Sequence, residues 1–147
     1  MSTKKLRSLY LSIILIIVLV LFIQLIPYGK NHANPALLSE PKWDSSQTRS
    51  LAQRACFDCH SNETVWPWYS NVAPVSWLIY RDVEEGRRKM NFSDWGTYFL
   101  KESNEIASVL NEGEMPPVQY LLMHKTARLS AAEKSQLVDG LIKTIGQ

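Results

Sequence analysis

One long apolar run, from Leu9 to Ile26, dominates the pattern of hydrophobic and polar positions. These 18 residues carry no charge, and only Tyr10, Ser12 and Gln24 dilute their apolar character. A helix of this length spans about 27 Å, close to the roughly 30 Å hydrocarbon core of a bilayer. A core helix of a small domain would need a polar face, which this run lacks. We therefore expect one membrane-spanning helix over residues 9–26.

Two fates of this helix are open, an uncleaved signal anchor or a cleaved signal peptide. Lys4, Lys5 and Arg7 precede the run, as in a signal peptide. However, the run is longer than the usual apolar region of roughly 7–15 residues, and no convincing small-x-small cleavage pair follows it. We favour the uncleaved anchor. The basic residues before the run predict that the N-terminus lies in the cytoplasm and that the residues after Ile26 are exported.

Further along the chain, apolar positions recur at helical spacing and predict short helices joined by loops. We expect helices over residues 45–56, 74–89 and 93–113, and a last one that begins at Ser130. Ser93 is the expected N-cap of the third, and Ser130 and Glu133 form an S-x-x-E capping box. The apolar residues expected on the buried faces are Leu51, Ala52, Ala55, Val75, Leu78, Ile79, Val83, Phe99, Ile106, Val109, Leu110, Leu137, Val138, Leu141, Ile142 and Ile145. Because no strand pattern is convincing, the predicted fold class is mostly α.

The chain thus divides into four expected segments. Residues 1–8 form a basic cytoplasmic tail, residues 9–26 the transmembrane anchor, residues 27–41 a linker, and residues 42–147 the folded domain. The linker contains three prolines and a glycine and has neither helical nor alternating periodicity. We expect His32, which lies in it, to be exposed and without function.

Charge is distributed unevenly along the chain. Three of the 16 Lys and Arg residues precede the apolar run, and the other 13 are balanced by 14 Asp and Glu. A nearly neutral exported part lacks the basic surface that nucleic-acid binding requires, so we expect no nucleic-acid partner. A composition that is 46% hydrophobic and 20% charged is typical of a folded protein.

Both cysteines lie in one short motif, Cys56-Phe-Asp-Cys59-His60. C-x-x-C-H is the attachment signature of c-type haem: two thiols at i and i+3 share a helix face, and the histidine that follows can ligate iron. A thioredoxin-like dithiol, a zinc site and a structural disulfide are the alternatives. No strand precedes the motif, a zinc site needs four ligands, and a disulfide leaves His60 unexplained. The pattern favours haem, with Cys56 and Cys59 as thioether donors and His60 as the proximal ligand.

A distal iron ligand is expected much later in the chain. Met115 follows His60 by 55 residues, in the proline-stiffened stretch GEMPP. A methionine opposite a histidine gives haem iron a raised reduction potential. Met115 could instead simply pack in the core. Met90, Met123 and His124 are the other candidates: core packing is the expected role of Met123, and His124 would give a bis-histidine haem.

These residues carry a resemblance to a known family. The block CHSNETVWPWYSN, from Cys59 to Asn71, and the stretch NEGEMPPVQY, from Asn111 to Tyr120, resemble the bacterial haem-binding domain family related to cytochromes c. The resemblance runs from about Pro41 to the C-terminus. It implies a small cytochrome c-like helical domain built around one covalent haem on Cys56, Cys59 and His60, and it supports Met115 as the sixth ligand.

Several other residues near these motifs have two interpretations each. Four aromatic residues either line the haem and bond its propionates or form ordinary core: Trp66, Trp68, Tyr69 and Trp77. Arg87, Arg88 and Lys89 are expected at a solvated helix end, with a docking patch or a propionate contact as the alternative. We expect Asp58, between the cysteines, to face solvent.

Together these features predict a monohaem c-type cytochrome on the outer face of a bacterial cytoplasmic membrane, in the periplasm. Two axial protein ligands leave no open iron site, so we expect electron transfer to redox partners that the sequence does not identify, rather than an enzyme. One alternative is a haem-based sensor in which Met115 is absent from the iron or easily displaced. The other is an exported thiol oxidoreductase that uses Cys56 and Cys59 without haem.

Overall fold

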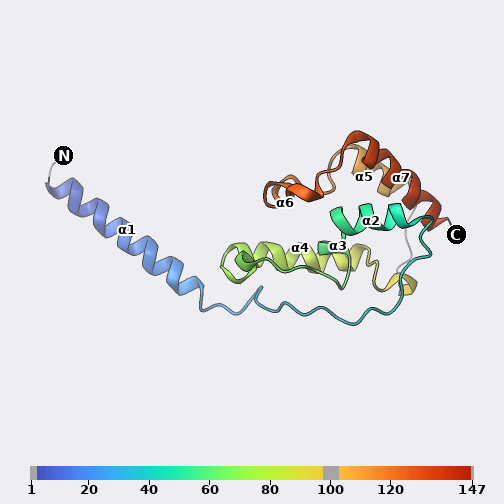
Figure 1. Cartoon of the computed structure of the whole chain (residues 1–147). Coiled ribbons are helices and arrows are strands. Elements are labelled where there is room, and N and C mark those ends of the chain that lie inside the picture. Colours follow the sequence, from blue (N-terminus) through green and yellow to red (C-terminus); the bar gives the residue numbers. More distant parts are fainter. Residues whose placement is uncertain (1–2, 98–102, 147) are drawn as a thin grey trace. The chain divides into compact units, whose positions relative to one another are not determined.

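Helices are the main regular element in this computed structural model, which describes residues 3–97 and 103–146 (Figure 1). The α-helices are α1 (Thr3–Ile23), α2 (Ser46–Ala55), α3 (Phe57–His60), α4 (Val75–Lys89), α5 (Ser103–Asn111), α6 (Val118–Met123) and α7 (Ala131–Ile145). Three short 3-10 helices are η1 (Trp68–Asn71), η2 (Trp95–Thr97) and η3 (Lys125–Ala127). Extended pairing in the described residues is limited to one isolated bridge between Ser39 and Asp94. The prediction of a mostly α fold is confirmed.

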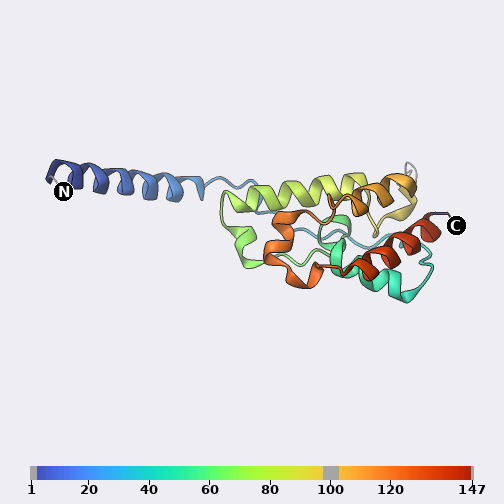
Figure 2. The same ribbon diagram turned by 90° about the horizontal axis from the view of Figure 1, so that it is seen from above.

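Helix α1 contains most of the apolar run, and none of its residues is buried against the rest of the protein. By length and composition it is apolar enough to cross a membrane. Two views at right angles show it as one continuous helix that passes into an extended segment (Figures 1 and 2). The expectation of one N-terminal helix that could span a membrane is therefore confirmed at the level of the helix.

The chain divides into two compact units that interleave along the sequence. The first unit comprises residues 1–33 and 66–82, and the second comprises residues 34–65 and 83–147. Helix α4 begins in the first unit and ends in the second.

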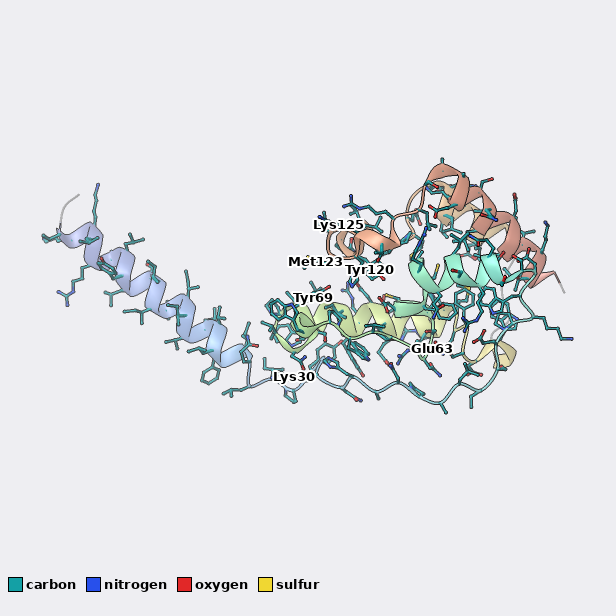
Figure 3. The ribbon with its side chains drawn as sticks, viewed as in Figure 1. Lys30, Glu63, Tyr69, Tyr120, Met123 and Lys125 are labelled. Carbon is teal, nitrogen blue, oxygen red and sulfur yellow. The ribbon has the colours of Figure 1, made fainter. Side chains whose placement is uncertain are left out.

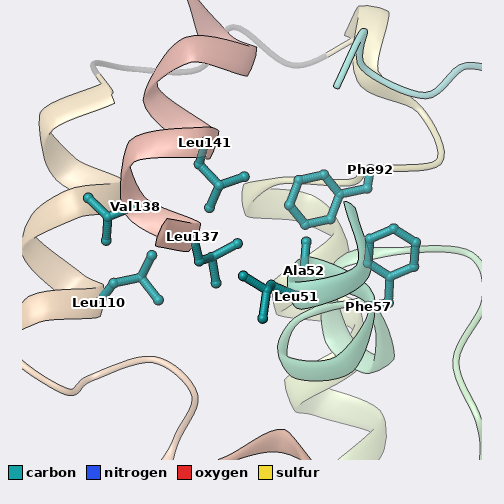
Figure 4. Packing of buried hydrophobic residues seen from close by; sticks show 8 residues of the cluster. All are labelled: Leu51, Ala52, Phe57, Phe92, Leu110, Leu137, Val138 and Leu141. Carbon is teal, nitrogen blue, oxygen red and sulfur yellow. The ribbon is translucent and has the colours of Figure 1, made fainter. Parts of the chain in front are cut away.

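The core of the second unit is a cluster of aliphatic and aromatic side chains (Figure 4). It contains Leu51, Ala52, Phe57, Phe92, Leu110, Leu137, Val138 and Leu141. Helices α2 and α7 both contribute to it. They approach each other closely at Gly140, where an added Cβ would overlap the side chain of Thr48. The hydroxyl of Ser45 accepts the Thr48 N–H at the start of α2, and the predicted capping box of Ser130 and Glu133 is present at the start of α7.

In the first unit, the segment after α1 packs along residues 66–80. Tyr28 makes an edge contact with Tyr80, with ring centroids 5.5 Å apart. The ring of His32 stacks on Trp66 at 4.5 Å, and its Nε2 lies 3.1 Å from the carbonyl oxygen of Ser70. The expectation that His32 is exposed is wrong, because these contacts leave it half-buried.

Helix prediction was accurate where the apolar stripe meets the core and less so elsewhere. Val83 and Leu137 are buried as expected, whereas Leu78 and Ile142 are exposed. Where one helix was predicted from Ser93, the described residues form η2 at Trp95–Thr97 and α5 from Ser103; Phe99, expected on its buried face, lies outside the described residues. The Ser93 hydroxyl caps no such helix: it is buried and accepts the backbone N–H of Asn62 at 3.0 Å.

Candidate functional site

The C-x-x-C-H motif folds as one separate helical turn directly after α2. At the end of α2, the N–H of Cys56 donates to the carbonyl of Ala52. The carbonyl of Cys56 accepts the N–H groups of Cys59 and His60 at 3.1 and 2.9 Å. Cys56 and Cys59 are half-buried thiols that are not joined in a disulfide. Phe57, which follows Cys56, is buried in the hydrophobic cluster and holds the turn in place.

The imidazole of His60 is oriented by a backbone carbonyl. Its Nδ1 lies 3.1 Å from the carbonyl oxygen of Met90. A carbonyl can only accept, so Nδ1 carries the proton and Nε2 carries the lone pair. Burial lowers the pKa of His60, although the hydrogen bonds to the carbonyls of Met90 and Gly86 act in the opposite direction. A neutral imidazole with a protonated, hydrogen-bonded Nδ1 is the form in which histidine binds a metal through Nε2.

Helix α4 lies close against the motif at a glycine. A Cβ added to Gly86 would overlap the carbonyl oxygen of Cys59 and lie 2.9 Å from its carbonyl carbon. On the other side of the turn, the backbone carbonyl of His60 accepts the N–H of Phe92 at 2.8 Å. The motif therefore contacts both the last turn of α4 and the segment that follows this helix.

Asp58, between the two cysteines, is half-buried rather than turned to solvent, so that prediction is wrong. Its Oδ2 accepts the phenol of Tyr120 at 2.7 Å, and its Oδ1 accepts the N–H of Val65 at 3.0 Å. The hydroxyl of Thr64 donates to its backbone carbonyl at 2.7 Å. Tyr120 lies on α6 (Figure 3) and was not identified from the sequence, because nothing in its local pattern indicates a partner so far away.

Arg87 is buried, so the prediction of a solvated helix end is wrong for this residue. Its Nε donates to the carbonyl of Ser61 at 2.8 Å, and its Nη2 donates to the side chains of Asn34 and Thr64 at 2.8 and 2.9 Å. Arg88 and Lys89, the next two residues, are exposed as expected. The guanidinium thus fastens the chain immediately after the C-x-x-C-H turn to α4.

Met115 lies in the turn between α5 and α6, and its N–H donates to the carbonyl of Val109 at 3.1 Å. Its side chain packs, partly buried, against the same hydrophobic cluster that Cys56 contacts. Met90 packs against this cluster as well. Met123 does not: 63% of it is exposed, so the expectation that it packs in the core is wrong (Figure 3).

The alternative distal ligand, His124, lies just after α6. Its ring stacks on Tyr120 with centroids 4.0 Å apart, and its Nδ1 lies 3.0 Å from the Tyr120 carbonyl. Within residues 3–97 and 103–146, no three side chains of His, Cys, Asp or Glu gather at one point as a metal site would require. A haem supplies four iron ligands itself, so one imidazole and one thioether complete its coordination.

The four aromatic residues expected in a haem pocket belong to the first unit, whereas the C-x-x-C-H turn belongs to the second. Trp66 stacks on His32, and Trp68 and Tyr69 make an edge contact at 5.7 Å. The indole N–H of Trp77 is buried and has no hydrogen-bond partner among the residues that the structure describes. A role for these residues beside a haem stays a prediction.

Comparison with known protein families gives a match over most of the chain. The model of a family described as haem-binding domain matches residues 18–143, which include the C-x-x-C-H turn and Met115. No curated protein matches the chain, and no solved structure does.

Proposed function

Because the chain belongs to the haem-binding domain family, we propose that it is a membrane-anchored c-type cytochrome that transfers electrons on the outer side of the membrane. Cys56 and Cys59 would hold one haem through thioether bonds, His60 would be the proximal iron ligand, and Met115 the distal one. The observation that carries this proposal is the hydrogen bond from His60 Nδ1 to Met90, which leaves Nε2 available for iron beside two thiols on one turn.

The residues around the turn suit such a group. A bound haem supplies an iron that cycles between ferric and ferrous states. The carbonyl of Met90 keeps the proton on Nδ1 of His60 and thereby increases the basicity of Nε2. Phe57 and Gly86 fix the turn against the core and against α4, which would keep His60 in one position relative to a bound haem.

A thiol oxidoreductase is less well supported. A catalytic cysteine needs a lowered pKa and an electropositive surrounding. Burial, with a smaller contribution from Cys59, instead raises the pKa of Cys56 to about 12.

A haem-based sensor is the second candidate, and one observation favours it. Helix α6, which directly follows Met115 and its two prolines, has no buried residue. Displacement of the thioether by a small ligand would require Met115 to leave the hydrophobic cluster and Tyr120 to release Asp58, but it would uncover no buried residue of α6 itself. In that case the protein would report ligand binding instead of carrying electrons.

Helix α1 provides the proposed membrane anchor. The basic residues Lys4, Lys5 and Arg7 precede its apolar part, which favours a cytoplasmic N-terminus and a periplasmic haem domain in a bacterial inner membrane. An anchored cytochrome of this kind would exchange electrons with redox proteins in or at the same membrane.

The test is to produce the full chain together with a c-type haem maturation system. We expect haem that stays on the polypeptide in a denaturing gel and is lost from Cys56→Ala and Cys59→Ala. Ferric protein should show the weak far-red band of a methionine–iron bond, absent in Met115→Ala and kept in the exposed control Met123→Ala. Absence of haem from the matured wild type would support the thiol function, and rapid carbon monoxide binding by the ferrous wild type would support the sensor.

A further inference from the structure

Gln24, just after α1, bonds both backbone groups of one distant residue. Its side-chain amide donates to the carbonyl of Ala73 at 3.0 Å and accepts the N–H of Ala73 at 2.9 Å. Lys30 donates to the backbone carbonyl of Gln24. These bonds satisfy a polar side chain that lies two residues before the end of the apolar run, where an unpaired amide would be costly. They also fix Ala73 at the depth at which α1 would leave the hydrocarbon.

Two further contacts fix the segment after α1 along the start of α4. Gly29 has φ +75°, and a Cβ there would lie 2.6 Å from the carbonyl oxygen of Ser76. The rings of Tyr28 and Tyr80 meet edge to face. Residues 66–82 are therefore bound directly to the end of α1 and to the segment that follows it.

A row of apolar side chains is exposed around Ala73. The exposed fractions are 78% for Trp68, 41% for Val72, 41% for Val75 and 52% for Leu78. Ala73 itself is buried between them. Val75 and Leu78 are three residues apart on α4 and lie on one face of it, whereas Trp68 belongs to η1 and Val72 directly follows η1. We name these four residues the apolar row.

Charge is scarce next to the apolar row. Within residues 66–82, the charged residues are Arg81 and Asp82, which pair with each other beyond the end of the row. Residues 24–33 contribute one charge, Lys30. The apolar row begins with Trp68, and the segment after α1 adds the basic residue Lys30. Apolar residues with a tryptophan and a basic residue are typical of segments that lie in the membrane interface.

We propose that the apolar row inserts into the interfacial layer of the leaflet from which α1 emerges, so that the protein contacts the bilayer at a second place. The inference rests on the proposed membrane anchor. The partner of the apolar row is a lipid surface. The Gln24–Ala73 bonds hold the row beside the end of α1, and a helix that spans the membrane places that end at the lipid interface. Trp68 then meets lipid headgroups instead of haem.

The experiment uses the full haem-loaded chain in lipid nanodiscs. A nitroxide is attached to Trp68→Cys, to Val75→Cys, to the polar control Arg81→Cys, and to Leu15→Cys within α1. Wild-type protein treated with the same reagent gives the background from Cys56 and Cys59. The ferric form is measured, because a reductant would reduce the nitroxide and consume the oxygen, and the signal of each variant under nitrogen is its baseline. Collision with oxygen, which partitions into lipid, is compared with collision with a water-soluble nickel chelate.

We expect the ratio of oxygen to nickel accessibility to be several-fold higher at positions 68 and 75 than at position 81, and highest at position 15. Equal nickel accessibility at 68, 75 and 81, with position 15 in lipid, would overturn this inference and leave the anchor intact. If position 15 is also accessible to the nickel chelate, the proposed membrane anchor is overturned as well. Protection of 68 and 75 from both reagents would mean that protein covers the row and would overturn the assignment to lipid. The haem spectrum confirms that each variant is folded.

Discussion

The phenol of Tyr120 donates a 2.7 Å hydrogen bond to Asp58, which joins α6 to the turn that carries both cysteines. Burial, and then the hydrogen bond to the neighbouring carboxylate, raises the pKa of Tyr120, so the phenol keeps its proton and remains the donor. Because Met115 lies just before α6, this bond also limits how far the proposed distal ligand can move from the turn that carries the cysteines.

Tyr120→Phe removes this donor and leaves the ring in place. We expect a loss of about 1–3 kcal/mol in the free energy of unfolding, the usual cost of leaving a charged acceptor without its partner. We also expect faster carbon monoxide binding by the ferrous protein, since α6 is less tightly held. Urea unfolding and flash-photolysis kinetics measure the two effects. Tyr80→Phe, in the first unit, is the control; an equal effect there would contradict the role of the Asp58 bond.

Arg87→Lys tests the buried guanidinium that binds Ser61, Asn34 and Thr64. A lysine cannot reproduce this forked set of donors. Loss of two such bonds from a charged group should lower the free energy of unfolding by at least about 2 kcal/mol. The matched control is Arg88→Lys, one residue further along α4 and exposed. Similar urea midpoints for the two variants would show that the network contributes little.

The helices that the sequence predicted well are those whose signals are local. The capping box of Ser130 and Glu133 and the apolar stripe of Leu137, Val138 and Leu141 are read within one helix, and α7 forms as expected. The exposure of Leu78 was missed because apolar periodicity alone does not say whether the facing surface is protein.

The polar partners could not be predicted because they lie far apart in the sequence. Tyr120 is 62 residues from Asp58, and Asn34 is 53 residues from Arg87. An acidic residue between cysteines and an arginine at a helix end are both typical of solvated positions, and only the tertiary fold brings their partners to them. The motif itself was recognised from sequence because its three residues act within one turn.

Gly86→Ala tests the close approach of α4 to the cysteine turn. In an unhindered helix this change would stabilise the protein by about 1 kcal/mol. Here the new methyl would overlap the carbonyl of Cys59, so we expect a lower melting temperature and less haem per polypeptide after maturation. Gly96→Ala is the control, since the nearest atom to its Cβ is 4.0 Å away. Unchanged haem content in Gly86→Ala would contradict the need for this contact.

Glu133 links the start of α7 to α2, and it should make stability depend on acid pH. Its Oε2 accepts the N–H of Ser130 at 2.8 Å, and its Oε1 pairs with Arg54 at 2.6 Å. The Ser130 N–H, followed by Arg54, lowers the pKa of Glu133 from 4.5 to about 2. A depressed carboxylate pKa contributes stability above the unfolded value and loses it as the pH falls through the folded value.

The stabilisation from Glu133 should therefore be complete above about pH 4.5 and decline between there and about pH 2. We expect Glu133→Gln to lower the urea midpoint at pH 6, and the gap to wild type to narrow as the pH approaches 2. Since other carboxylates titrate in the same range, only the difference in urea midpoint between wild type and Glu133→Gln reports on Glu133. Glu84→Gln, an exposed carboxylate on α4, is the control. A gap that stays constant from pH 6 to pH 2 would mean that the charge of Glu133 contributes nothing.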